Sequence, residues 1–333
     1  MRIVTTGRSS RERWPLMSGR FVISLDFELL WGVRDHADRR SYGANILGAR
    51  TAIPRMLDLF AANDIRATWA IVGFLFCENK EELLDCVPEV MPAYTNARFS
   101  NYGYFDEIGR DERTDPYYFA PSLIDQIAQT PGQEIGTYTL SHFYCLEDGA
   151  TAEAFEADLK GALRLASRRG ITLGSIVFPR NQFAAAHLDI CARLGISTYR
   201  GNPPGWAYQA AKGEEQTYSR RALRLVDAYS GVLGAHSFAP AGGSPANVPA
   251  SRFLRPCAGR LARLHPLHIA TIKRGMTATV RAGAGYHLWW HPHNFGGDVQ
   301  GNMQGLSTLI SHFVELRDGY GMASCSMGVA PCV

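Results

Sequence analysis

Two carboxylates, Asp26 and Glu28, directly follow an apolar run, FVISL, at residues 21–25. Such a run of strand-forming residues is typical of a strand buried on both faces of a parallel sheet. Residues two apart in an extended chain point to the same side, so both carboxylates would face one place. Burying two acids together is unfavourable unless a cation or a proton lies between them. The spacing therefore indicates either a cation or proton-transfer site or, equally, two acids in a solvated loop.

Other residues suited to chemistry stand where further strands are predicted to end. Arg180 follows Pro179, which favours an extended approach, and its guanidinium could hold a carboxylate through two hydrogen bonds or form a structural ion pair. His291 and His293 flank a proline; one could donate a proton, since imidazole titrates near neutral pH, or both could be structural. Trp31, just past the two acids, is expected to line a pocket.

The elements that must position these groups alternate between strand and helix about six times. Strands are predicted at 21–25, 67–76, 134–140, 175–179, 196–199 and 286–290. Helices are predicted near 46–63, with Pro54 in the first turn, and near 81–87, 121–129, 151–169, 184–194, 220–232, 261–280 and 302–317, while 34–42, 98–118 and 242–249 are predicted loops. The alternation is typical of an α/β protein with a parallel sheet.

A distorted (β/α) barrel of about seven units explains the pattern better than a doubly wound sheet, because no GxGxxG follows any predicted strand. In a barrel the carboxyl ends of the strands share one rim, where active sites lie. The residues expected at that rim are Asp26, Glu28, His142, Arg180, Arg200 and His291.

Composition limits the classes of function. The 34 basic and 31 acidic residues give a net charge of +3, which offers no electrostatic case for binding nucleic acid or an anionic membrane. Seven cysteines without a CxxC pair indicate reduced thiols in a cytoplasmic protein. Residues 1–20 lack the apolar core of a secretory signal and are predicted to be a flexible lead-in to one domain over 21–330. No apolar run approaches membrane-spanning length.

Four segments, SLDFELLWG, QEIGTYTLSH, FPRNQ and WWHPHNFG, stand in this order along the chain. Together they resemble the polysaccharide deacetylases of carbohydrate esterase family four, and most of all the branch found among bacterial surface-polysaccharide genes. The resemblance covers roughly residues 21–327. It implies a metal-dependent hydrolase that removes an N-acetyl or similar N-acyl group from a sugar during surface polysaccharide biosynthesis, with a divalent metal that is usually zinc.

The resemblance also implies roles for single residues. Asp26 matches the general base, Glu28 the metal carboxylate and His142 the second metal histidine. Arg180 matches the arginine that orients the base, and His291 matches the catalytic histidine. The position of the first metal histidine holds Tyr138 instead, and a phenol with a pKa near about 10 is a poor zinc ligand. The residues expected to contact the substrate are Trp31, Asn181, Arg200 and His293.

Tyr138 leaves alternatives open. With Glu28 and His142 as the conventional ligands, the metal could be weakly bound, different or absent, and the protein could be a weakened or non-catalytic carbohydrate-binding homologue. A third hypothesis is that the protein is a related hydrolase that acts on cyclic imides or ureides. As an enzyme it would act in the cytoplasm on an N-acylated sugar, a sugar nucleotide or a lipid-linked saccharide.

Overall fold

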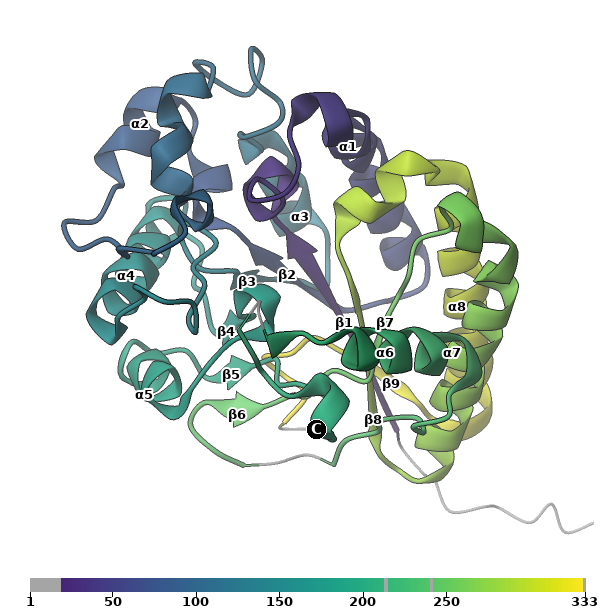
Figure 1. The fold of residues 1–333 in the computed structure, drawn as a ribbon. Coiled ribbons are helices and arrows are strands. Elements are labelled where there is room, and N and C mark those ends of the chain that lie inside the picture. The colour runs from purple at the N-terminus through teal and green to yellow at the C-terminus, as the bar shows by residue number, and fades with distance from the viewer. Residues whose placement is uncertain (1–18, 213–214, 240–241, 332–333) are drawn as a thin grey trace, which may run out of the picture.

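The strands of the protein form one parallel sheet that curls into an open half-barrel (Figure 1). The computed structural model describes residues 19–212, 215–239 and 242–331, so the predicted lead-in lies almost wholly outside the described residues. The sheet order is β6-β5-β4-β3-β2-β1-β8-β7, with β9 pairing along the start of β1. The distorted (β/α) barrel with parallel strands is thereby confirmed. The strands are β1 Arg20–Phe27, β2 Ala67–Ile71, β3 Gln133–Thr137, β4 Ser175–Ile176, β5 Thr198–Tyr199, β6 Ala246–Asn247, β7 Arg252–Phe253, β8 Gly285–Trp290 and β9 Ala323–Cys325.

Strand β1 lies at the centre of the sheet. It is buried at every position after Arg20, as the apolar run predicts for a strand covered on both faces. Its register fixes the geometry of the rim. Leu25 is paired with Trp290 of β8, so Asp26, the next residue, lies beside the residue that follows β8. On the other side Phe27 is paired with Ile71 of β2.

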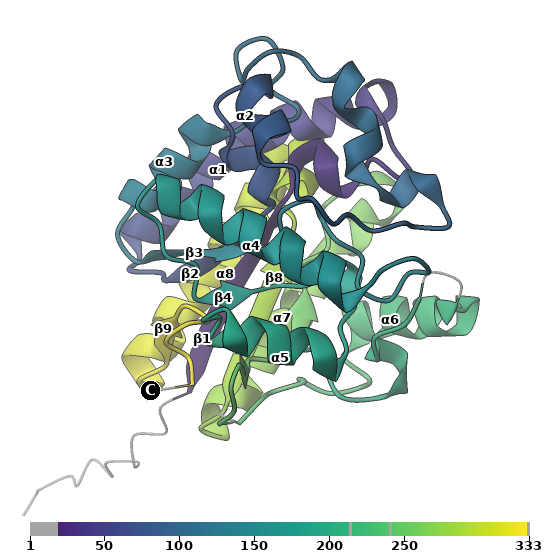
Figure 2. The same cartoon turned by 90° about the vertical axis from the view of Figure 1, so that its left-hand side faces the viewer.

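Helices cover the outside of the sheet, with α4 and α5 on one side and α7 and α8 on the other (Figures 1 and 2). The helix α4 shows why the sequence predicts them well. Thr151 caps its first turn by accepting a hydrogen bond from Ala154 N, and the buried stripe includes Phe155 and Leu159. The helices are α1 Arg39–Ala62, α2 Lys80–Asp85, α3 Pro121–Gln129, α4 Ala152–Arg168, α5 Ala185–Arg193, α6 Tyr218–Ser230, α7 His265–Arg281 and α8 Val299–Tyr320.

The largest difference from the sequence prediction lies in α1, which begins at Arg39 rather than near Ile46. Asp38 and Ser41 form a reciprocal capping box, with Ser41 N donating to Asp38 Oδ1 at 2.8 Å and Asp38 N to Ser41 Oγ at 3.0 Å. Pro54 lies in the interior of the helix and not in its first turn. In the interior, the proline removes one backbone hydrogen bond of the helix. The buried face of α1 therefore outweighs the local cost of the proline.

Three short strands were not predicted: β6, within the predicted loop 242–249, β7 and β9. Each has two or three residues, too few for any hydrophobic period to show. Within 19–331, the two gaps apart, we find no helix with the length and apolar character needed to cross a membrane.

Candidate functional site

A cavity of about 360 Å³ opens at the carboxyl ends of β1, β3, β4 and β8. The parallel strands bring polar residues from distant parts of the chain to this one rim, as the barrel predicts. Its lining includes Glu28, Asp35, His36, Tyr138, His142, Arg180, Asn181, Trp289, His291 and His293.

Strained backbone marks the same edge. Five non-glycine residues just after β1, β3 and β4 have positive φ angles: Leu29, Thr139, His142, Arg180 and Asn181. Each such conformation costs about 1–3 kcal/mol and persists only where its surroundings enforce it. Sharp turns at the rim therefore decide where each side chain points.

Asp158 of α4 enforces the turn that carries His142. Its carboxylate accepts hydrogen bonds from Leu140 N at 2.7 Å and Ser141 N at 3.2 Å, and a further bond from Ser141 Oγ. Asp158 is fully buried, and burial raises its pKa to about 6 although these hydrogen bonds oppose the shift. A helix residue thus holds the loop after β3 in the conformation that aims an imidazole at the cavity.

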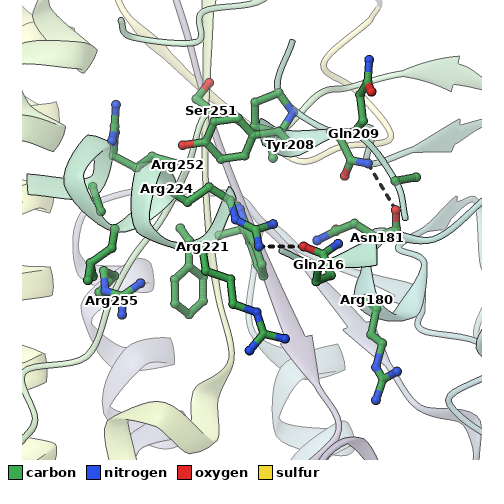
Figure 3. Close-up of a pocket in the computed structure, with 18 residues that line it drawn as sticks. Arg180, Asn181, Tyr208, Gln209, Gln216, Arg221, Arg224, Ser251, Arg252 and Arg255 are labelled. Atoms are coloured by element: carbon green, nitrogen blue, oxygen red, sulfur yellow. Dashed lines mark hydrogen bonds between the residues drawn. The ribbon is translucent and has the colours of Figure 1, made fainter. Parts of the chain in front are cut away.

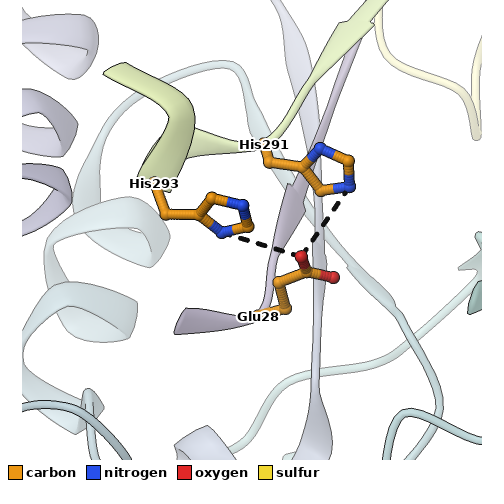
Figure 4. A group of neighbouring side chains, drawn as sticks. All are labelled: Glu28, His291 and His293. Carbon is orange, nitrogen blue, oxygen red and sulfur yellow. Dashed lines mark ion pairs between the residues drawn. The ribbon is translucent and has the colours of Figure 1, made fainter. Parts of the chain in front are cut away.

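Glu28 lies at the centre of a cluster of imidazoles (Figure 4). Glu28 Oε1 is 3.6 Å from His293 Nδ1 and 3.8 Å from His291 Nε2, and Glu28 Oε2 is 3.1 Å from His142 Nε2. Among the described residues, Glu28, His291 and His293 form a group whose ligand atoms all lie within 4.8 Å of one another. The structure therefore brings His293 and His291 to Glu28, in addition to the predicted His142.

Burial controls the charges in this cluster. It raises the pKa of Glu28 to about 8, lowers that of His142 to about 3 and lowers that of His293 well below its usual value. Three enclosed atoms, Glu28 Oε2, His142 Nδ1 and His293 Nδ1, have no hydrogen-bond partner. Neutral imidazoles and a carboxyl group that loses its proton when a metal binds, all with unpartnered buried atoms, match the donor set that zinc prefers, so these residues fit a divalent cation.

Asp26 lies beneath the cavity and is held by Arg200. Arg200 Nη1 donates to Asp26 Oδ1 at 2.6 Å and Nη2 to Asp26 Oδ2 at 2.7 Å, and Nη1 also donates to Ser24 Oγ. The guanidinium stacks on Trp289, 4.1 Å from the ring centroid, and neither member of the ion pair is exposed to solvent. Arg200 is therefore an internal partner of Asp26 and does not line the cavity as a substrate contact.

Arg180, which was expected to orient Asp26, does not contact it. Its guanidinium donates instead to Asp35 and, at 3.1 Å, to Glu147 Oε1. The expected arginine is corrected to Arg200, because the positive φ of Arg180 turns its side chain away whereas Arg200 continues directly from β5.

Trp31 also differs from its expected position. It is buried, its indole Nε1 donates to Tyr118 O at 2.9 Å, and its ring packs against Phe74. It is absent from the described cavity lining, because the short helix Leu29–Gly32 directs it into an aromatic cluster. Trp289, by contrast, lines the cavity.

Tyr138 does line the cavity, with its ring edge against His142 at a centroid distance of 5.0 Å. Burial, together with the charges of Asp26 and Glu28, raises the pKa of Tyr138 well above its usual value. The phenol therefore stays protonated, which suits it to donating a hydrogen bond rather than to binding a metal.

His36 and Asp35, which lie in the predicted polar loop 34–42, were not predicted as residues of the site. His36 Nδ1 is 2.8 Å from Asp35 Oδ1, and that hydrogen bond raises the pKa of His36. His36 lines the cavity with an exposed side chain, so the cavity contains an imidazole that is hydrogen-bonded to a carboxylate. The adjacent Asp-His pair in this loop was the one signal that could have found them.

No family model matches this chain, and no curated protein matches it. Several solved structures, however, are similar to this chain over almost its whole length. A protein assigned as a polysaccharide deacetylase from Mycobacterium smegmatis is 14% identical, with a TM-score of 0.61 over 98% of this chain and 93% of that one. The Puue allantoinase is 11% identical, with a TM-score of 0.54 over 97% and 95%. A protein assigned as a polysaccharide deacetylase from Pseudomonas aeruginosa PAO1 is 11% identical, with a TM-score of 0.53 over 94% and 90%. These likenesses show a shared fold.

Proposed function

We propose that this protein is a metal-dependent hydrolase that removes an N-acetyl, or similar N-acyl, group from a sugar. The observation that carries the proposal is the cluster of Glu28, His291 and His293 on the floor of a rim cavity. The fold shared with proteins assigned as polysaccharide deacetylases supports the class of reaction. The four sequence segments that resemble that family supply most of the groups lining the cavity.

Glu28, His291 and His293 would hold the cation, for which zinc is the best match to nitrogen and oxygen ligands. When bound, a divalent cation supplies Lewis-acid polarisation of the acyl carbonyl and makes water easier to deprotonate. This ligand set replaces the one that the resemblance implied, because Tyr138 stays protonated and His142 approaches only the other oxygen of Glu28. The role of His142 is then to orient the Glu28 carboxylate.

Hydrolysis of an amide also needs a group that takes a proton from water and returns one to the leaving amine. The resemblance implies Asp26 as the acceptor and His291 as the donor. The geometry favours His36, because Asp26 is fully enclosed with both oxygens bonded to Arg200, whereas His36 reaches the cavity. Asp35 holds the imidazole of His36 through its Nδ1, which leaves Nε2 for proton transfer in both directions.

The substrate is an N-acylated sugar, with a sugar nucleotide or a lipid-linked saccharide as its proposed form. The protonated phenol of Tyr138 and the amide of Asn181 line the cavity and can donate hydrogen bonds to it. A place in bacterial surface polysaccharide biosynthesis in the cytoplasm follows from the resemblance and stays a prediction.

Two other functions make different predictions. A non-catalytic carbohydrate-binding homologue, suggested by Tyr138, would bind N-acyl sugars without releasing the acyl group. A hydrolase of cyclic ureides, suggested by the allantoinase among the similar folds, would open a hydantoin-like ring and leave N-acyl sugars intact.

The test combines metal content with product release. Protein purified without chelator is examined by elemental analysis, and acetate release from N-acetyl sugars is compared with ring opening of hydantoins. We expect one divalent ion per chain, acetate release and no ring opening. Binding of N-acetyl sugars with neither reaction, in metal-loaded protein, would contradict the proposal.

Matched single variants then separate the roles. Glu28→Gln and His291→Gln should each weaken zinc binding by about a hundredfold, and His142→Gln by about tenfold or less, because a directly bound ligand matters more than a residue that orients it. His36→Gln should lower kcat by about a hundredfold or more with zinc affinity unchanged. If His142→Gln loses zinc while His291→Gln keeps it, the cation lies on the His142 side and His291 is the proton donor.

A further inference from the structure

A second cavity, of about 480 Å³, lies beside the first, between α6 and β7 (Figure 3). Five of its lining residues are arginines: Arg180, Arg221, Arg224, Arg252 and Arg255. None of its described lining residues is an aspartate or a glutamate. A cavity with five guanidinium groups and no acid in its described wall is suited to an anionic ligand.

Two of the arginines are already neutralised. Arg252 is buried, and its Nη1 donates to Asp227 Oδ2 at 3.1 Å and to Asp227 O at 2.7 Å. Arg180 is paired with Asp35 and Glu147. Arg252 nonetheless keeps one enclosed Nε without a hydrogen-bond partner. A buried guanidinium whose position is fixed therefore forms one wall of the cavity.

The other three, Arg221, Arg224 and Arg255, have no carboxylate partner among the residues that the structure describes. Arg224 Nη2 donates to the amide oxygen of Gln216 at 2.7 Å, which fixes its position without neutralising it. Burial, and then the neighbouring charges of Arg220 and Arg221, lower the pKa of Arg224. The cavity thus collects about three uncompensated positive charges, which repel one another until an anion binds.

The arginine cavity adjoins the proposed catalytic cavity. Arg180, Asn181, Phe253 and Trp289 line both of them. A ligand that extends over these four shared residues could therefore place one group beside the Glu28 cluster and another among the arginines.

We propose that the arginine cavity binds the phosphate or diphosphate group of a phosphorylated N-acyl sugar. The proposal rests on the proposed function, which places the N-acyl group at Glu28. Three unpaired guanidinium groups match the two or more charges of a phosphomonoester or diphosphate better than the single charge of a carboxylate. The diphosphate could belong to a sugar nucleotide or to a lipid-linked sugar, because the cavity recognises the chemistry that both share.

Binding is tested by calorimetry on the metal-loaded protein, without measuring turnover. The ligands are inorganic pyrophosphate, glucuronate, N-acetylglucosamine, its 1-phosphate, UDP-N-acetylglucosamine and a short polyprenyl-diphosphate N-acetylglucosamine. The variants are Arg224→Gln and Arg255→Gln. Arg281→Gln, at the exposed end of α7 and outside both cavities, is the control with the same change in charge.

We expect Arg224→Gln and Arg255→Gln each to weaken binding of pyrophosphate and of the phosphorylated sugars by about tenfold or more, with Arg281→Gln unchanged and neutral N-acetylglucosamine unaffected by any of them. Whichever diphosphate binds more tightly identifies the source of the group. Equal affinities in wild type and arginine variants, or tighter binding of glucuronate than of pyrophosphate, would overturn the proposal. If the protein releases no acetate but its affinity for pyrophosphate depends on Arg224, the proposed hydrolase activity is refuted and this binding site is kept. If the protein is active but its affinity for pyrophosphate does not depend on Arg224, this binding site alone is refuted.

Discussion

Replacing Arg200 with methionine should lower the free energy of unfolding by about 3–5 kcal/mol, the usual cost of removing one partner from a buried ion pair. Neither Arg200 nor Asp26 is exposed to solvent, and two hydrogen bonds of 2.6 and 2.7 Å join them. Methionine fills much of the same volume and can pack on Trp289, so the loss reports mainly the charge. It would leave Asp26 with His291 Nε2, at 3.5 Å, as a remaining polar neighbour.

Two variants test whether the loss comes from this pair. In Asp26→Asn combined with Arg200→Met no charge remains uncompensated, so the double variant should be more stable than the sum of the single losses predicts by about 1–3 kcal/mol. Arg180→Met removes the same guanidinium from a side chain that is 31% exposed. Solvent screens this site in part, although Asp35 and Glu147 are buried, so the cost should be smaller, about 1–2 kcal/mol.

Denaturant unfolding at pH 7, followed by circular dichroism, measures four variants: Arg200→Met, Asp26→Asn, the double variant and Arg180→Met. A loss below about 1 kcal/mol for Arg200→Met, or a loss equal to that of Arg180→Met, would show that Arg200 does not neutralise a buried Asp26. Strictly additive losses in the double variant would refute the pairing as well.

Two further predictions concern the cavity. Tyr138→His should bind zinc at least about tenfold more tightly than the wild type, since it adds an imidazole beside Glu28 and His142; equal dissociation constants in a zinc titration would show that position 138 cannot reach the ion. Asp35→Asn should move the basic limb of the kcat–pH profile to lower pH. Asp35 raises the pKa of His36, and the protonated donor is lost as pH rises through that pKa. Glu28 also raises the pKa of His36 and Arg180 lowers it, and both influences remain in the variant. An unmoved basic limb would exclude His36 as the proton donor.

The rim itself could be predicted from the sequence, because buried apolar runs that end in polar residues mark where parallel strands stop. Asp26, Glu28 and His291 lie together because the register of β1 on β8 aligns their strand ends. That register follows from the burial of both strands, and a shift by one residue would move their buried side chains to the opposite face.

Which arginine reaches Asp26 could not be predicted, because Arg180 and Arg200 both follow a strand. The choice depends on the turn after β4, where Arg180 and Asn181 have φ angles of 54° and 53°. The direction of a side chain at such a turn depends on its competing contacts with solvent and with neighbouring side chains, and these contacts produce no periodic pattern in the sequence. The buried position of Trp31 could not be predicted for the same reason, because it is set by the aromatic cluster around Phe74 and not by the residues next to Trp31 in the chain.

The two carboxylates that follow β1 are equivalent in sequence and opposite in environment. Asp26 receives a fixed cation, because Arg200 satisfies both of its oxygens. Glu28 meets imidazoles instead, and burial keeps those of His142 and His293 neutral, so they cannot balance its charge in the same way. Asp26 is therefore stabilised by the protein and can organise the floor of the site. Burial raises the pKa of Glu28 to about 8, so a proton balances this acid near neutral pH until a divalent cation displaces that proton. The two acids therefore differ in role because Arg200, which follows β5, lies beside Asp26, whereas imidazoles that follow β3 and β8 lie beside Glu28.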